Sequence, residues 1–129
     1  MEKSFIKGTW QQNRAFSPAV VTKDGRTIWL AGHGALKDKT GKSLSGDFEA
    51  QTHAVFAALS DTLEQAGASL QDIVTMTVFI LDVRHGDRFT ELRKQYFPDG
   101  FPASAMITVT GFAQPEMMIE IQGIAVTAA

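Results

Sequence analysis

Apolar residues gather along this chain in two kinds of pattern, short runs and one-sided stripes. Short runs rich in Val, Ile, Thr and Phe, bounded by polar or glycine-containing segments, are typical of strands. The dipeptide Asp24-Gly25 separates the first two runs and predicts a tight hairpin turn between them. The pattern predicts strands over residues 19–22, 27–31, 73–81, 105–110 and 117–126.

A longer segment, over residues 48–66, has the three- and four-residue spacing of an amphipathic helix. Asp47 or Ser45 can cap its N-terminus, and Gly67 provides a C-terminal stop. Residues 69–72 resemble a capping box and predict one additional helical turn.

A second amphipathic helix is predicted over residues 88–97, because Phe89, Leu92 and Tyr96 fall on one stripe. The residues before about Pro18 are polar with isolated aromatics, so we expect an extended arm there rather than a helix.

The predicted order is β-β-α-β-α-β-β. Crossover connections through a helix are almost always right-handed, so both helices should lie on the same face of one mixed β-sheet. This order predicts a two-layer α+β domain. With 129 residues and a mass of 14.0 kDa, the chain has the length of one domain, which we assign to residues 1–129.

The strand over 73–81 is predicted to be apolar on both faces, and the strand over 117–126 is similar. Two helices cover only one face of a sheet, and monomers avoid large exposed apolar patches. We therefore expect a homo-oligomer that buries the other face, the alternative being that loops or the N-terminal arm cover it. In strand 73–81 the two sets are Ile73, Phe79 and Leu81, and Val74, Met76, Val78 and Ile80.

Composition removes several classes of function. The chain has no cysteine, which excludes disulfides, thiolate nucleophiles and iron–sulfur clusters. Its formal net charge of -2 gives no indication of a basic nucleic-acid-binding face. The first residues lack the apolar core of a secretion signal, and no apolar run approaches a membrane span, so we expect a cytoplasmic protein.

Three histidines are present, at positions 33, 53 and 85, and their spacing does not fit a metal site. His33 is the one candidate for ligand binding, because Gly32 and Gly34 flank it at the end of a predicted strand. The alternative is a solvated loop histidine.

Glu120 is the most informative acid, because it lies within a largely apolar strand. It is either on a solvated face or held in a pocket, where desolvation would raise its pKa toward the range of a general base. Candidate anchors for an anionic ligand are Arg14, Arg84, Arg88 and Arg93, although Arg88 and Arg93 fit the solvated face of the second helix equally well. Met106, Met117 and Met118 fit either a soft apolar site or plain core.

The order and spacing of several segments, spread over about residues 13–126, resemble the RidA (YjgF) family. No single motif among them is decisive, but together they are specific. They are Arg14-Ala15-Phe16-Ser17-Pro18-Ala19-Val20, Ile28-Trp29-Leu30-Ala31-Gly32, Gln51 with 59–67, Asp72-Ile73-Val74 through 77–82, Phe101-Pro102-Ala103, and Ile119-Glu120-Ile121 with Ile124-Ala125-Val126.

The resemblance implies a chorismate-mutase-like fold and a homotrimer in which three sheets enclose a central barrel, with the helices outside. It places small-molecule sites in clefts between neighbouring subunits. Members with the full catalytic set hydrolyse reactive enamines and imines to ketoacids and ammonia without metal or cofactor. Glu120 aligns with the glutamate that activates water in those members.

Four polar positions of the family site differ in this chain. The arginine that follows Phe-Pro-Ala in active members is Ser104, and the cysteine often found two residues later is Met106. The tyrosine that the family has in the N-terminal segment is replaced by Phe16. The serine that the family has before the glycine of the second strand is replaced by Ala31, and the glycine itself is present as Gly32. The resulting prediction is Glu120 as catalytic residue, with Arg14, Phe16, Ala31, Gly32, His33, Ser104 and Met106 binding substrate.

These differences predict a divergent deaminase that acts on a neutral or apolar imine or enamine, or on one whose anion Arg14 holds. The alternatives are a non-catalytic trimeric module that binds a small molecule, and a vestigial site. Endoribonuclease activity ranks third, because the chain has no basic strip and no histidine pair. A Glu120 carboxylate that faces an open cleft favours catalysis, whereas a salt bridge to Arg14 or Arg93 favours a structural role.

Overall fold

Four strands form the main sheet of the computed structural model, which describes residues 1–129. Their spatial order is β3 (Arg26–His33), β6 (Ile119–Thr127), β4 (Ile73–Ile80) and β5 (Ala103–Thr108). β6 pairs antiparallel with both β3 and β4, and β4 pairs parallel with β5. The sheet is therefore mixed, as predicted from the order of the elements.

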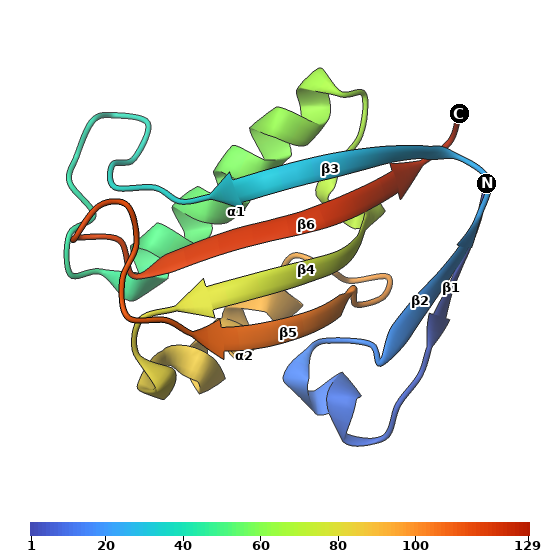
Figure 1. Ribbon diagram of the computed structural model, residues 1–129, viewed down its shortest axis with the longest axis horizontal. Coiled ribbons are helices and arrows are strands. Elements are labelled where there is room, and N and C mark those ends of the chain that lie inside the picture. Colours follow the sequence, from blue (N-terminus) through green and yellow to red (C-terminus); the bar gives the residue numbers. More distant parts are fainter.

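Both helices, α1 (Phe48–Gln65) and α2 (Gly86–Lys94), lie on the same side of this sheet (Figure 1). α1 connects β3 to β4, and α2 connects β4 to the parallel strand β5, as right-handed crossovers require. The predicted two-layer α+β fold is confirmed. Short 3-10 helices over Leu70–Asp72 and Val83–His85 flank β4, and the first of them carries the predicted capping box.

The ends of α1 follow its sequence signals. The Asp47 carboxylate accepts a hydrogen bond of 3.0 Å from the Ala50 N–H, and Gly67 has a φ of 75°. α2 ends before the predicted position, because Gln95 and Tyr96 donate to carbonyls three residues earlier and tighten the last turn.

The hydrophobic core lies between the helices and the sheet. α1 and α2 present apolar stripes to it, and every second residue of β4 and β6 meets them. Its largest fully buried side chains include Phe56, Leu59, Leu63, Phe89, Phe97, Met76, Ile80, Ile119 and Ile121.

The N-terminal segment corrects two predictions. β1 (Glu2–Ile6) pairs antiparallel with β2 (Ala19–Lys23) in a separate two-stranded ribbon, and β2 does not pair with β3. The predicted hairpin is therefore wrong, although Asp24 and Gly25 do make a sharp corner, with φ of 64° and 100°. A turn signal specifies the corner but not the partner, and β1, which was not expected as a strand, takes that edge of β2.

The second correction concerns the predicted arm, because Trp10–Arg14 forms a 3-10 helix rather than an extended segment. After it, Ser17 fastens the chain to the start of β5. Its N–H donates to the Pro102 carbonyl at 3.0 Å, and its hydroxyl donates to the Phe101 carbonyl at 2.7 Å. These bonds hold the N-terminal segment beside the outer edge of the sheet.

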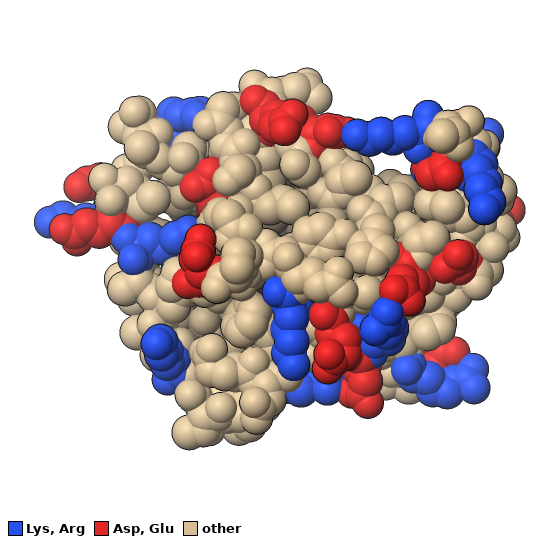
Figure 2. Space-filling view, turned by 180° about the vertical axis from the view of Figure 1, so that it is seen from behind, with Lys and Arg blue, Asp and Glu red and all other residues tan.

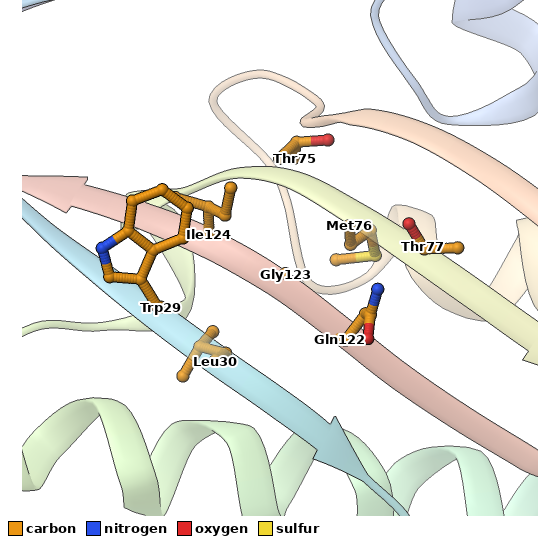
Figure 3. Close-up of a pocket in the computed structure, with 8 residues that line it drawn as sticks. All are labelled: Trp29, Leu30, Thr75, Met76, Thr77, Gln122, Gly123 and Ile124. Carbon is orange, nitrogen blue, oxygen red and sulfur yellow. The ribbon is translucent and has the colours of Figure 1, made fainter.

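The face of the sheet opposite the helices is uncovered, and the β1–β2 ribbon lies to its side (Figure 1). A register shift after Ile73 turns that side chain toward the helices, so the prediction that it shares a face with Phe79 is wrong. The open face is a mixture of polar and apolar side chains. Trp29, which is 76% exposed, and Ile124 border a hollow of about 240 Å³ whose other lining includes Thr75, Thr77 and Gln122 (Figure 3).

Neither helix combines the length and the apolar character that a membrane span requires.

Gln51, on α1, connects the helix to the segment that leads into β6. Its side chain is fully buried, and Nε2 donates to the carbonyls of Leu44 at 3.0 Å and Glu116 at 2.9 Å. Its Oε1 accepts a hydrogen bond of 2.8 Å from the Met118 N–H. One amide thus satisfies backbone groups on two separate loops.

We predict that Gln51→Ala lowers the free energy of unfolding by about 3 kcal/mol, because it leaves buried backbone groups unpaired. Urea unfolding measures the change. The matched control is Gln65→Ala on the exposed side of the same helix, which should cost less than about 0.5 kcal/mol. Equal losses in the two variants would contradict the role assigned to Gln51.

Candidate functional site

Apart from His33, the predicted site residues fall into two groups at opposite faces of the sheet. The first group is at the open face, where Glu120 of β6 lies against Gly32 of β3, and Ala31 precedes Gly32 in that strand. Glu120 is opposite Phe79 in the register, whereas its neighbours Ile119 and Ile121 are buried under the helices. Because successive residues of a strand point to opposite faces, the Glu120 side chain projects away from the core.

Gly32 leaves the space that the Glu120 carboxylate occupies. A Cβ atom at this position would lie 2.7 Å from Oε1 and 2.8 Å from Cδ of Glu120. The carboxylate therefore lies directly over the β3 backbone, beside the register shift between Leu30 and His33. A glycine is needed at position 32 because any side chain there would overlap the Glu120 carboxylate.

Glu120 takes part in none of the ion pairs of the chain. Arg14 pairs with Asp87 at 2.7 Å, and Arg93 donates to Ser104 and to the Arg14 carbonyl. The carboxylate is half-buried and unpaired on an open face. Glu120 therefore lacks the salt bridge to Arg14 or Arg93 that would favour a structural role, although it lines none of the hollows of the chain.

The second group lies on the helix side, at the β5 edge. Ser104 and Met106 are opposite Met76 and Val78 of β4, so they share the face that the helices cover. With Arg14 and Phe16 of the N-terminal segment they line a cavity of about 360 Å³. The cavity is completed by Trp10, Thr90, Arg93 and Ala105.

Arg93 is the residue of this cavity that sequence reasoning left undecided. It is only 2% exposed, so the solvated interpretation is wrong. Its Nη1 donates to the Ser104 hydroxyl at 2.7 Å, its Nη2 donates to the Arg14 carbonyl at 3.0 Å, and its guanidinium lies 5.0 Å from the centre of the Phe89 ring. The available signal was its four-residue spacing from Phe89, which places both on the buried stripe of α2.

The electrostatic environment of Arg93 is unfavourable to its charge. Burial, together with the positive charge of Arg14, lowers the pKa of Arg93 to about 10. Its Nε is buried and has no hydrogen-bond partner in the chain. Arg93 therefore remains protonated at neutral pH without a carboxylate to balance it.

His33 lies on the helix side, away from Glu120. Its Nδ1 is 2.8 Å from the Ala31 carbonyl, and its Nε2 is 2.8 Å from the Thr62 hydroxyl. Because a carbonyl only accepts, Nδ1 carries the proton and Nε2 accepts from Thr62. The side chain thus connects β3 to α1, which is a structural arrangement.

No group of three or more His, Cys, Asp or Glu side chains is arranged to hold a metal ion. On the helix side of the molecule, basic and acidic side chains are interspersed over the surface (Figure 2). This face presents no continuous basic strip of the kind that follows a nucleic-acid backbone.

Comparison with known proteins gives a consistent family. The family model described as Endoribonuclease L-PSP matches residues 10–127. A RutC family protein of Pyrococcus abyssi is 33% identical over 80% of this chain and 80% of its own length. A 2-iminobutanoate/2-iminopropanoate deaminase of Homo sapiens is 28% identical over 86% and 79% of the two chains. A 3-aminoacrylate deaminase RutC of Acinetobacter baylyi is 29% identical over 97% of this chain and 98% of its own length.

A solved structure also matches the whole chain. It is a protein of unknown function of the conserved Rid family, YyfB from Yersinia pestis, with a TM-score of 0.86 and 27% identity. The match covers 98% of this chain and 100% of that one. The α+β fold is therefore shared with the Rid proteins.

We predict that His33 and Thr62 are coupled in stability. In a double-mutant cycle of His33→Ala, Thr62→Val and the double variant, the coupling free energy should be about 1 kcal/mol, because each single change removes the same hydrogen bond. Urea unfolding of the four proteins gives the value. A coupling near zero would mean that His33 does not fasten β3 to α1.

Proposed function

We propose that this chain, which belongs to the Endoribonuclease L-PSP family of RidA, YjgF and RutC proteins, is a hydrolytic deaminase of a reactive enamine or imine. A relative from Homo sapiens carries a name for an imine deaminase, and one from Acinetobacter baylyi carries a name for an enamine deaminase. The observation that carries the proposal is the Glu120 carboxylate, which is half-buried, free of cations and held over Gly32.

In the proposed reaction, Glu120 accepts a proton from water while the water oxygen bonds to the imine carbon. The carbon–nitrogen double bond becomes a single bond, and the nitrogen takes up a proton from solvent. The carbinolamine then collapses: the carbon–nitrogen bond breaks, ammonia leaves, and the hydroxyl gives its proton to solvent while its oxygen becomes the carbonyl oxygen. The proton that Glu120 removed returns to the leaving nitrogen, so neither redox change nor metal is needed.

We propose that the working unit is a homotrimer with sites between neighbouring subunits. In one chain, Glu120 and Ser104 lie on opposite faces of the sheet, so a small molecule cannot touch both. A ring of subunits brings the open face of one chain toward the β5 edge of the next. The exposed Trp29 and the hollow beside it would then be covered (Figure 3).

The substrate in this proposal is bound in a non-standard way. The residue after Phe101-Pro102-Ala103 is Ser104, and a serine cannot form the two charged hydrogen bonds that an arginine gives a carboxylate. Phe16 and Met106 make the surroundings of Ser104 more apolar. These features favour a substrate that carries an apolar group.

We predict that Glu120→Gln lowers the rate constant for imine hydrolysis by about 10² to 10⁴-fold, because the amide cannot accept the water proton. Imines would be generated in the assay by an amino-acid or amine oxidase from charged and neutral precursors, and carbonyl product or ammonia would be followed. Glu116→Gln, which changes an exposed acid three residues before the strand, is the matched control and should keep wild-type rates.

The assay separates the candidate functions. Acceleration that disappears in Glu120→Gln supports the deaminase. If wild type and Glu120→Gln both match the uncatalysed rate over the whole panel, the deaminase proposal fails, and a non-catalytic binding module becomes the better account. Equal acceleration by both proteins would remove Glu120 from the mechanism.

We predict that Gly32→Ala lowers the hydrolysis rate about tenfold or more while it changes the free energy of unfolding by less than about 1 kcal/mol. The added Cβ displaces the flexible end of Glu120 rather than backbone. Gly111→Ala, where a Cβ would meet nothing within 4 Å, is the control. Parallel kinetics and thermal unfolding measure both effects, and unchanged kinetics in Gly32→Ala would contradict the geometry.

A further inference from the structure

The largest hollow of the chain, with a volume of about 680 Å³, lies on the side of α1 that faces away from the sheet. None of the α1 residues that line it belongs to the buried set of that helix. Its second wall is the loop that connects β3 to α1 (Figure 1). This α1 hollow has the volume of a site for a small organic molecule.

The floor of the α1 hollow consists of methyl groups. The outward face of a surface helix normally carries charged or long polar side chains. Here the outward positions that line the hollow, spaced three and four residues apart, include Ala50, Ala54, Ala57 and Ala58. His53 adds an imidazole ring beside them, in hydrogen-bond contact with the Tyr96 hydroxyl. This floor leaves space that a flat apolar group can fill.

The loop wall is held in place by hydrogen bonds of its own. Oδ1 of Asp38 accepts from the Thr40 N–H at 2.9 Å, from the Thr40 hydroxyl at 2.6 Å and from the Lys42 N–H at 3.0 Å. The Leu44 N–H donates to the Leu36 carbonyl at 2.8 Å and closes the loop. The wall is therefore formed without a ligand, and the Asp38 carboxylate is engaged within the loop.

The charges that remain for a ligand are mostly positive. Lys37 and Lys39 line the α1 hollow, and neither takes part in an ion pair. Their long side chains can cover apolar surface while the ammonium groups reach a ligand at the rim. Asp61 is the one other acid of the lining, and it is exposed and without an ion pair. Two free ammonium groups against one free carboxylate favour an anion.

We propose that the α1 hollow binds an amphipathic organic anion, whose flat apolar body lies on the alanine floor and whose acidic group contacts Lys37 and Lys39. The hollow shares no lining residue with the cavity beside Ser104, and Glu120 does not line it. The inference is therefore independent of the proposed deaminase function. Because the hollow faces away from the sheet, the proposed trimer, which covers the open face, leaves it accessible.

Fluorescence titration of the full-length protein with anilinonaphthalene sulfonate, at constant ionic strength, tests the proposal. Phenylnaphthylamine is the neutral probe with the same rings and no sulfonate. We expect the double variant Lys37→Gln/Lys39→Gln to raise the dissociation constant of the sulfonate about tenfold and to change that of the neutral probe less than about twofold. Ala57→Leu, which fills the floor, should weaken both probes about tenfold.

Two further variants sharpen the test. Lys7→Gln/Lys23→Gln makes the same change in net charge at two exposed lysines that line no hollow, and it should leave both dissociation constants unchanged. Asp61→Asn removes the free acid of the lining, so it should tighten binding of the sulfonate and not that of the neutral probe.

The proposal is overturned if the sulfonate shows no saturable binding, or if the Lys37→Gln/Lys39→Gln variant binds it like wild type. Sulfonate bound elsewhere, such as beside the exposed Trp29, would give that second result. Equal weakening of both probes by the lysine substitutions would also refute an anion site. The two lysines are exposed, so their variant keeps the test decisive should Ala57→Leu not fold.

Discussion

The alternation of side chains along a strand decides where chemistry can occur in this protein. β6 buries Ile119 and Ile121 and must therefore turn Glu120 to the open face, whereas β5 follows the register of Met76 and turns Ser104 toward the helices. A shift of one residue in β6 would expose Ile119 and Ile121, so the outward position of Glu120 is strongly specified. Within one chain, Glu120 and the cavity beside Ser104 therefore face opposite sides of the sheet.

This separation leaves two charges unbalanced. Glu120 has no cation on the open face, and Arg93 has no anion beneath α2. The residues that contact both groups are neutral: Gly32 lies beneath the carboxylate, and the Ser104 hydroxyl and the Phe89 ring contact the guanidinium. A polar ligand at a junction between two subunits would contact both Glu120 and Arg93. The trimeric deaminase that we propose depends on this arrangement.

Much of the fold was predictable because its signals are local or periodic. The Asp47 cap, the Gly67 stop and the stripe of α1 each act within a few residues, and the order of elements then determines one covered face. The pairing of β2 was not predictable, since Asp24-Gly25 describes a corner and says nothing about which strand competes for the edge.

The site was predicted in the same uneven way. Glu120 and Gly32 were expected together and lie in contact, whereas His33 points the other way because it follows one residue after Gly32 on an alternating strand. Arg93 was ambiguous because an arginine beside an apolar stripe can either bury or solvate its head. Only packing against Phe89 and the N-terminal segment decides between the two.

Mixed trimers provide the most direct test of the claim that two chains build each site. Glu120→Gln and Ser104→Phe, the second of which fills the cavity, would be purified, unfolded together in equal amounts and refolded. In a three-membered ring, each mixed assembly holds one site with neither substitution, so random mixing predicts about a quarter of wild-type hydrolysis. Activity no greater than that of the two variants refolded separately would contradict the account.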